Sequence, residues 1–338
     1  MSMKQAILLV VASLSCAALC RAQTSACVND APNPYRLVTD WAHLPRPWAS
    51  TNNVFVDAQD RVWVFDRCED KGCVGSQMSP IWEVSGDGNV IRNFGAGMFV
   101  FPHQVVTDKS GNIWVVDNQG NNGKGMQVSK LSPDGKVLMT LGKAGQGGAD
   151  LDVFERPNSV AIAPNGDIFV AEGHAPGFGN SRIMKFSADG KFIKTFGHLG
   201  SGDGELKGPH VLAFDSAGRL FVADRSNNRV VIFDQDGKFI AAWKQFGRPS
   251  GIWIDKNDLL YAADSQSEDA PGQDTNNPGC KRGIRIGSAK TGKVEYLIPP
   301  PPVTSAAIPP PEGVAVDSHG TIYAAGMEAK TVYKFVKK

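Results

Sequence analysis

Two histidines and one glutamate occupy the same place in three repeats of the sequence, and together they could hold a metal ion. His103, His210 and Glu312 each open an apolar segment that leads into a turn and a second apolar segment. Two imidazoles and one carboxylate are a known ligand set for zinc, and this set leaves one coordination position for water or substrate. Iron, cobalt and manganese accept the same donors, so the sequence does not distinguish among these metals.

These residues share a position because a repeated unit runs through the chain. Each unit has an apolar segment with alternating polarity, a turn rich in Asp, Asn and Gly, and a second apolar segment. This pattern is typical of a β-hairpin. The copies are HQVVTDKSGNIWVVD (103–117), NSVAIAPNGDIFVAE (158–172), HVLAFDSAGRLFVAD (210–224) and EGVAVDSHGTIYAAG (312–326), with the diverged NVFVDAQDRVWVFD (53–66) and SGIWIDKNDLLYAAD (250–264).

The repeats predict an all-β fold, a six-bladed β-propeller with four-stranded antiparallel blades. Several hairpins continue into a third and a fourth apolar segment, as in residues 181–197 and 228–243. One such unit would expose its apolar faces, whereas six units packed in a ring bury those faces together. The last copy has only three strands, so we expect residues 35–41 to supply the fourth and close the ring. The propeller itself is predicted over residues 50–338.

The residues that open the first strands should form a ring at one mouth of the central channel, because the first strand of each propeller blade lines that channel. All six are polar, although the strands that follow are apolar: Asn52, His103, Asn158, His210, Ser250 and Glu312. The two histidines and the glutamate fall in alternate blades, at threefold spacing, which is why we expect them to share one ion. The alternative is that the whole ring is hydrated polar packing at a channel entrance.

Loops that follow the second strands should rise around the same mouth. They carry Arg67 and Arg225, whose paired N–H donors suit a substrate carboxylate. Alternatively, Arg225 pairs locally with its neighbour Asp224. His174 lies in the longer loop HAPGFGN, where it could carry a proton near neutral pH.

The first residues predict export. Lys4, an apolar run over residues 6–18 and the small Ala22 are typical of a signal peptide over residues 1–22, which an N-terminal segment over residues 23–49 would follow. We therefore expect a secreted or periplasmic protein that is monomeric and has no membrane partner. Removal of the signal peptide lowers the formal net charge from +1 to −1, and this balance argues against nucleic acid as a partner.

Four cysteines remain after the predicted cleavage, and an exported protein can pair them as disulfides. They are Cys27, Cys68, Cys73 and Cys280. Three pairings are open. Cys68 and Cys73 enclose a short loop and form the preferred pair, which leaves Cys27 with Cys280.

Several motifs carry a resemblance to a known family. They are FPHQVVTD, GNSRIMKFSADGKF, GPHVLAFD and FVADRSNNRV. In these motifs the chain resembles the NHL-repeat propellers, and among them the peptidyl-α-hydroxyglycine α-amidating lyases, over nearly all of residues 50–338. That family holds zinc on three histidines in Pro-His settings. His103 and His210 match the first two, and Glu312 stands at the third, so the resemblance implies a divalent metal site with one altered ligand.

The resemblance also implies roles for the loop residues. Arg67 and Arg225 match two arginines near the substrate carboxylate, and His174 stands where the family has a tyrosine that transfers a proton. The family's structural calcium takes an aspartate directly after the third histidine. Gly313 stands at that position, which argues against the structural calcium, although backbone carbonyls near Val54 and Val105 could still bind it.

The function implied by the resemblance is a metal-dependent lyase. It would cleave an α-hydroxy C–N bond of a small or peptide-like carboxylate substrate, releasing an amide and an α-oxo acid such as glyoxylate. Two other functions stay open. One is a metal-dependent hydrolase such as a lactonase, since other six-bladed propellers hold one divalent ion at this mouth; the other is a non-catalytic NHL binding module, because a fold alone fixes no chemistry.

Overall fold

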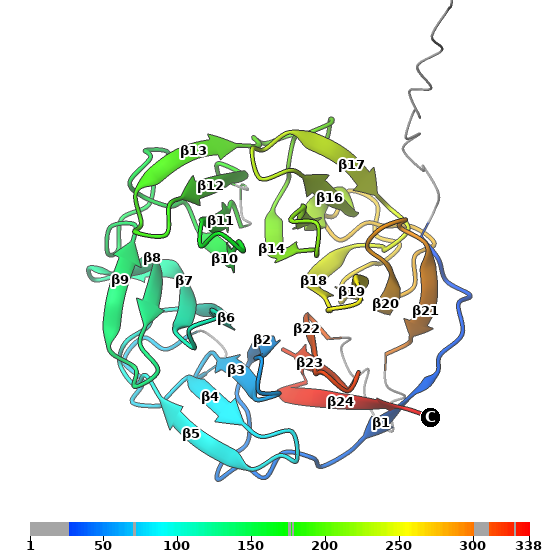
Figure 1. Cartoon of the computed structure of the whole chain (residues 1–338), viewed down its shortest axis with the longest axis horizontal. Coiled ribbons are helices and arrows are strands. Elements are labelled where there is room, and N and C mark those ends of the chain that lie inside the picture. The colour runs from blue at the N-terminus through cyan, green and yellow to red at the C-terminus, as the bar shows by residue number, and fades with distance from the viewer. Residues whose placement is uncertain (1–26, 70–71, 175–176, 178, 301–310, 328) are drawn as a thin grey trace, which may run out of the picture.

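The chain forms six four-stranded antiparallel sheets arranged around one axis, which confirms the predicted all-β, six-bladed propeller (Figure 1). The computed structural model describes residues 27–69, 72–174, 177, 179–300, 311–327 and 329–338. The predicted signal peptide lies outside these residues. In the described part of the chain, no helix is long and apolar enough to span a membrane.

Blades 1 to 3 follow one another along the chain, and each runs from the axis outward. Blade 1 contains β2 (Thr51–Val56), β3 (Val62–Asp66), β4 (Ile81–Val84) and β5 (Val90–Phe94). Blade 2 contains β6 (Pro102–Thr107), β7 (Ile113–Asn121), β8 (Lys124–Leu131) and β9 (Val137–Leu141). Blade 3 contains β10 (Pro157–Ile162), β11 (Ile168–Glu172), β12 (Arg182–Phe186) and β13 (Phe192–Phe196).

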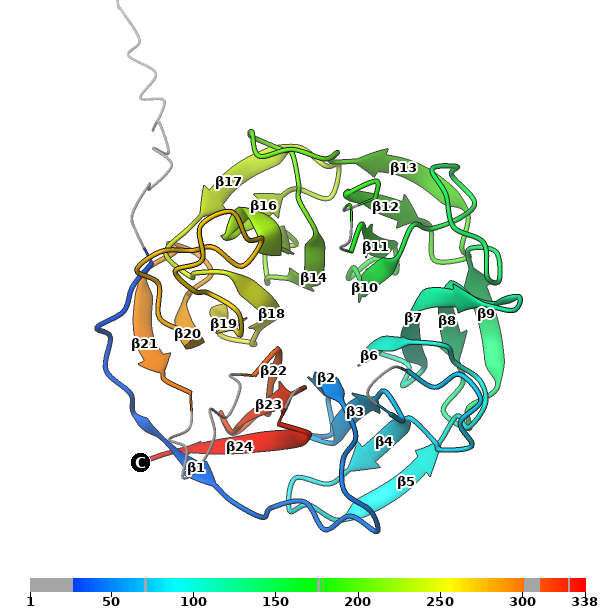
Figure 2. The same ribbon diagram turned by 180° about the vertical axis from the view of Figure 1, so that it is seen from behind.

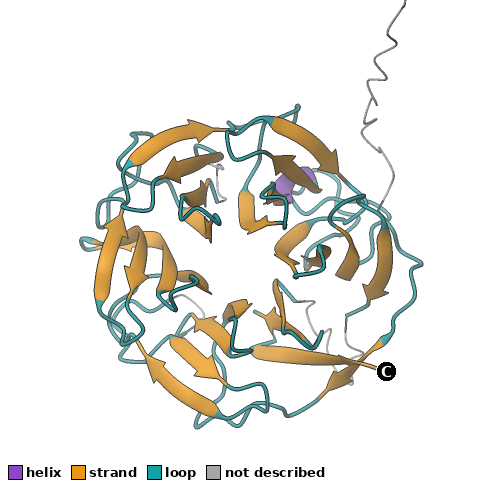
Figure 3. Cartoon of the chain, viewed as in Figure 1, coloured by secondary structure: helices purple, strands orange, loops and turns teal. Residues whose placement is uncertain are grey.

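Blades 4 to 6 complete the circle, and Figure 2 shows the same ring from behind. Blade 4 contains β14 (Pro209–Phe214), β15 (Leu220–Asp224), β16 (Arg229–Phe233) and β17 (Phe239–Trp243), with the short 3₁₀ helix η1 (Arg225–Asn227), drawn purple in Figure 3. Blade 5 contains β18 (Pro249–Ile254), β19 (Leu259–Asp264), β20 (Gly283–Ser288) and β21 (Val294–Ile298). Blade 6 contains β22 (Gly313–Val316), β23 (Ile322–Gly326), β24 (Thr331–Lys337) and β1 (Tyr35–Val38).

The two ends of the chain close the ring. Strand β1 pairs antiparallel with β24, and Tyr35 lies opposite Lys337. The predicted closing strand is therefore confirmed, although its regular part ends at Val38 rather than at residue 41. Beyond it, the indole Nε1–H of Trp41 donates a 2.8 Å hydrogen bond to the carbonyl of Val332, which extends the attachment after the ladder ends.

The cores lie between neighbouring blades, because each sheet buries both faces against the next. Between blades 2 and 3, Trp114 and Val116 pack with Val170 and Met184. Equivalent clusters fill the other junctions. Burial of this kind gives a closed ring a cooperative core that a single blade lacks.

A buried carboxylate at the end of the second strand fixes the loop that leads into the first strand. It accepts backbone N–H groups from that loop in five blades, and the carboxylates are Asp66, Asp117, Glu172, Asp224 and Asp264. Four of them also pair with an arginine: Arg46, Arg182, Arg229 and Arg285. These bonds hold the segment that presents each ring residue to the axis.

Asp117 differs from the others in its charge balance. It accepts the N–H groups of Val100 and Phe101 at 2.8 and 2.6 Å, but among the ion pairs of the described residues none involves Asp117. Burial raises the pKa of this carboxyl to about 6. The two N–H donors that favour the anion do not offset its loss of hydration.

We predict that Asp117 makes the protein less stable as the pH rises. Between its unfolded pKa and about 6, the folded state holds the proton more tightly than the unfolded state, so stability falls with rising pH. The free energy of unfolding of the wild type, relative to Asp117→Asn, should fall by about 2 kcal/mol between about pH 4.5 and about pH 7.5. Urea denaturation at both pH values measures this difference. A difference that is constant with pH would contradict the assigned burial effect.

Candidate functional site

A β-bulge aims the ring residue at the axis in blades 1 to 5. Side chains on a strand alternate between two directions, but the register between first and second strands shifts at the ring position in blades 1 to 5. In blade 2 the shift lies between Pro102 and Gln104, so it falls on His103. A bulge leaves one residue outside the pairing and turns its side chain. The imidazole is therefore directed by backbone geometry rather than by strand alternation.

Each of four ring side chains bonds to the main chain of the next blade. The amides of Asn52 and Asn158 donate 2.7 Å hydrogen bonds to the carbonyls of His103 and Pro209. The Nδ1 of His103 lies 2.7 Å from the carbonyl of Asn158, and the Nδ1 of His210 lies 2.5 Å from that of Ser250. A chain of inter-blade bonds thus runs around the mouth.

These bonds fix the tautomer of both histidines. A carbonyl oxygen can only accept, so the Nδ1 atom of His103 and of His210 carries the proton, and each Nε2 keeps its lone pair. Burial lowers the pKa of both imidazoles well below the ordinary value, because a charged ring would lose its hydration. Both are therefore neutral at pH 7, which is the form that binds metal.

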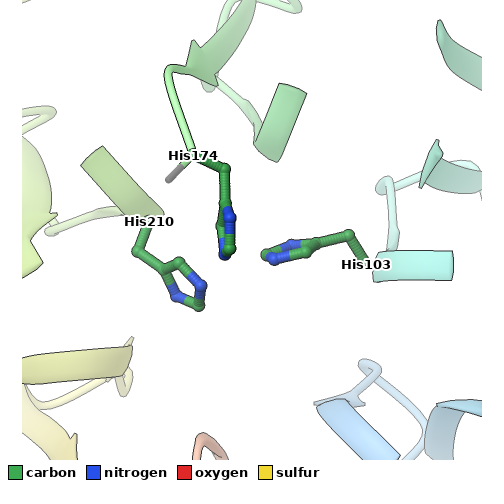
Figure 4. Close-up of side chains that lie close together, drawn as sticks. All are labelled: His103, His174 and His210. Atoms are coloured by element: carbon green, nitrogen blue, oxygen red, sulfur yellow. The ribbon is translucent and has the colours of Figure 1, made fainter. Parts of the chain in front are cut away.

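His174 joins these two histidines. The three rings point toward one another (Figure 4), and one ring nitrogen from each lies within 4.8 Å of those of the other two. The His103 ring centroid lies 4.9 Å from that of His210 and 5.4 Å from that of His174. His103 and His210 come from the first strands of blades 2 and 4, whereas His174 follows β11 of blade 3.

This trio fits a divalent metal ion. The Nε2 of His103 is buried and has no hydrogen-bond partner among the described residues, and an unpaired buried acceptor is costly unless something occupies it. Three neutral imidazoles are the ligand set of an open zinc site, and backbone carbonyls that hold Nδ1–H are its usual support. The buried trio could therefore bind a metal.

Glu312 lies beside the trio and pairs with Arg225. One carboxylate oxygen is 3.5 Å from Arg225 Nη1 and 3.6 Å from His210 Nε2. The structure thus brings the three residues of the predicted ligand set to one mouth, but the closest cluster contains His174 in place of Glu312. Coordination by Glu312 stays a prediction.

Arg225 connects the carboxylate with two of the histidines. Its Nη1 donates to His210 Nε2 at 3.1 Å, and its Nη2 donates to His174 Nε2 at 3.4 Å. The alternative local pair with Asp224 is not formed, because Asp224 pairs with Arg229. Burial lowers the pKa of Arg225 to about 10, so the guanidinium remains charged at neutral pH.

Arg67 is the second cation at this mouth. Its guanidinium lies over the ring of Phe101 at 4.1 Å, and its Nη1 contacts Met327 Sδ at 3.0 Å. Burial lowers the pKa of Arg67, and the charge of Glu312 partly opposes that change. Two arginines face one glutamate beside neutral imidazoles, so the mouth has an excess positive charge that would attract an anionic ligand.

The remaining ring residues have structural contacts. Asn158 Oδ1 accepts a 3.0 Å hydrogen bond from the amide of Asn118, and the hydroxyls of Ser250 and Ser265 lie 2.7 Å apart. The bonds of Asn158 and Asn52 connect neighbouring blades, whereas the contact of Ser250 lies within blade 5. For these three residues the contacts agree with the alternative of polar packing at the channel entrance.

Gly313 explains why an aspartate cannot follow the ring residue in blade 6. A Cβ atom built there would lie 2.9 Å from the Asn52 carbonyl oxygen and 3.1 Å from the Cα of Asn53. The first strands of blades 6 and 1 approach too closely for a side chain. The aspartate of the family's calcium site therefore has no room at this position.

Both predicted disulfides are present. Cys68 pairs with Cys73, and Cys27 pairs with Cys280. The second bridge ties the segment before β1 to the loop that precedes β20. Structural disulfides persist in oxidising compartments, so the pair indicates an extracytoplasmic location.

Comparison with known proteins agrees with the repeats. The NHL repeat family matches residues 206–233. Peptidyl-glycine alpha-amidating monooxygenase B of Xenopus laevis is 31% identical over 84% of this chain and 32% of its own length. The chain is an NHL-repeat propeller related to the amidating lyases.

Two lyase relatives extend this comparison. Peptidyl-alpha-hydroxyglycine alpha-amidating lyase 2 of Drosophila melanogaster is 30% identical over 58% of this chain and 50% of its own length. A probable lyase of the same name from Caenorhabditis elegans is 35% identical over 47% of this chain and 43% of its own length. The NHL-repeat propeller therefore spans about a third of the Xenopus protein and about half of these lyases.

Solved structures support the fold alone. A streptogramin B lyase superposes with a TM-score of 0.56 over 90% of this chain and 98% of its own, at 16% identity. A putative gluconolactonase superposes with a TM-score of 0.58 over 93% of this chain and 94% of its own, at 14% identity. At these identities the likeness shows a shared propeller.

We predict that His174, rather than Glu312, decides metal retention. His174→Ala should lower bound metal at least about tenfold, since loss of one of three ligands leaves an incomplete site. Glu312→Gln keeps the size of the side chain and should retain metal near one ion per chain. Elemental analysis of both variants after dialysis measures this. The opposite result, loss of metal in Glu312→Gln with full retention in His174→Ala, would contradict this prediction. It would favour coordination by His103, His210 and Glu312 instead.

Proposed function

We propose that this NHL-repeat propeller is a secreted or periplasmic metal-dependent lyase similar to the peptidyl-α-hydroxyglycine α-amidating lyases. The substrate would be a small or peptide-like molecule in which one carbon carries a hydroxyl, a carboxylate and the nitrogen of an amide. The observation that carries the proposal is the trio of His103, His174 and His210 beside two buried arginines, in a chain related to these lyases. The neutral imidazoles of His103 and His210 suit a divalent ion, with zinc preferred. The two arginines suit an anionic substrate.

The three histidines would hold the ion, and its chemistry would be that of a Lewis acid that makes the substrate hydroxyl more acidic. The inter-blade bonds orient His103 and His210 before the ligand arrives. This preorganisation avoids the cost of turning the rings during the reaction.

The arginines would position the substrate carboxylate. Arg67 and Arg225 both interact electrostatically with Glu312, so the substrate carboxylate would enter a site already matched to a negative charge. Planar guanidinium groups bind a carboxylate through two parallel N–H donors. In this arrangement the Arg225 guanidinium would turn from the histidines toward the substrate.

A base must take the hydroxyl proton as the C–N bond breaks. The O–H bond breaks and a C=O bond forms, while the amide nitrogen leaves and gains a proton, so the products are an amide and an α-oxo acid. His174 is the family-based candidate for this transfer, but a histidine that binds the ion cannot also carry the proton. If His174 is a ligand, we propose the Glu312 carboxylate as the acceptor, because it lies at the same mouth, 3.6 Å from His210 Nε2.

The direct test is release of glyoxylate from an N-acyl-α-hydroxyglycine by the protein loaded with zinc. We expect metal-dependent glyoxylate and amide in equal amounts, and a loss of at least about a hundredfold in kcat/KM for His103→Ala. Arg67→Lys should mainly raise KM, because lysine cannot offer the same paired donors. Ile193→Ala, on an exposed outer strand, is the matched control.

The same assay separates the other two functions. Acid release from lactones without an α-oxo product would favour a hydrolase. If protein that contains metal turns over neither substrate, the lyase proposal is wrong. The non-catalytic binding module is then the remaining hypothesis.

A further inference from the structure

A cavity lies on the axis away from the histidine mouth, and we call it the lower cavity. It has a volume of about 440 Å³, and its walls come from the first strands of all six blades. Its rim contains Asp108, Ser110 and Pro164, which belong to the turns at the far end of those strands. It therefore opens on the face opposite the histidines, and neither the histidine trio nor the two arginines line it.

The walls of the lower cavity are apolar and uneven. Phe55 and Trp253 meet edge to face with ring centroids 5.1 Å apart, which gives one aromatic side. Ala161 and Ala213 line another part, where small side chains leave the space open. An aromatic wall facing small residues favours a flat, apolar ligand body.

The inner end of the lower cavity offers hydrogen-bond donors. Asn53 Oδ1 accepts the N–H of Val105 at 3.0 Å, and Gln104 Oε1 accepts the N–H of Val160 at 2.7 Å. These bonds fix both amides with their oxygens toward the backbone, so each NH₂ group faces elsewhere. Asn53 and Gln104 are only 7% and 4% exposed, and within the described chain their NH₂ groups donate no hydrogen bond.

The charge of the lower cavity restricts the ligand. Its inner end has amide donors but no cation, since Lys109 and Lys130 belong to the outer part and Lys130 pairs with Asp108 at 3.3 Å. A buried carboxylate would lose its hydration without a partner charge. A neutral oxygen acceptor satisfies the amide donors without that cost.

We propose that the lower cavity is a binding site for a neutral small molecule with a flat apolar body and a carbonyl oxygen at one end. The body lies against Phe55 and Trp253, and the oxygen accepts from the amides of Asn53 and Gln104. This site is separate from the histidine mouth and does not depend on the proposed lyase activity.

The test uses 6-propionyl-2-dimethylaminonaphthalene, a neutral fluorescent naphthalene with one carbonyl oxygen. Titration of the full chain should give saturable binding at one dye per chain, with emission shifted to shorter wavelength. Ala161→Phe and Ala213→Leu fill the cavity and should each weaken binding at least about tenfold. Ile193→Phe adds an apolar group on an exposed outer strand and should leave binding unchanged.

Two further measurements separate the outcomes. Thermal unfolding shows which filled variant remains folded, and either one suffices. Binding that persists in His103→Ala and in the presence of a chelator places the dye away from the metal mouth. Absence of saturable binding to the wild type, or equal affinity in a folded filled variant, would overturn the proposal.

Discussion

The mouth depends on one constraint, a bulge at the start of the first strand of a blade. The side chain of the bulged residue bonds to the next blade. The bulge removes one residue from the alternation of the strand and turns it toward the axis. The following inter-blade bond then fixes that side chain, and at His103 and His210 it also fixes the tautomer. One arrangement therefore joins neighbouring blades and orients two imidazoles that could bind a metal. The stability of the ring of blades and the geometry of its mouth depend on the same atoms.

Electrostatics at this mouth follow from burial. The imidazoles are neutral because a charged ring would lose its hydration, while the arginines keep their charge because an arginine pKa stays far above neutrality even when it is lowered. Glu312 compensates part of that charge through Arg225. A metal ion and a carboxylate substrate would replace contacts that the residues now make with one another, so Arg225 has to exchange partners on binding.

Much of this structure could be predicted from the sequence, because a propeller repeats its signals. Alternating apolar segments with Asp-Gly turns predict the blades. The last copy lacks a fourth strand, which predicts closure by an N-terminal strand, and Tyr35–Val38 forms it. The mouth residues followed from the alignment of repeats, which placed His103 and His210 at equivalent positions. The alignment also places His174 at the mouth, but its approach to the other imidazoles depends on the path of an irregular loop, for which no periodicity exists. The bulges, the inter-blade bonds and the steric limit at Gly313 also lie beyond reach, since they depend on distances between strands of different blades.

The central claim is that the imidazoles of His103, His210 and the loop residue His174 converge on one point at the channel mouth. X-ray diffraction from crystals of the zinc-loaded protein, with anomalous data on both sides of the zinc edge, tests it most directly. The account predicts one anomalous peak at the mouth, about 2.1 Å from a ring nitrogen of each of His103, His174 and His210. A mouth without a peak, or a peak bound by none of these rings, would contradict it.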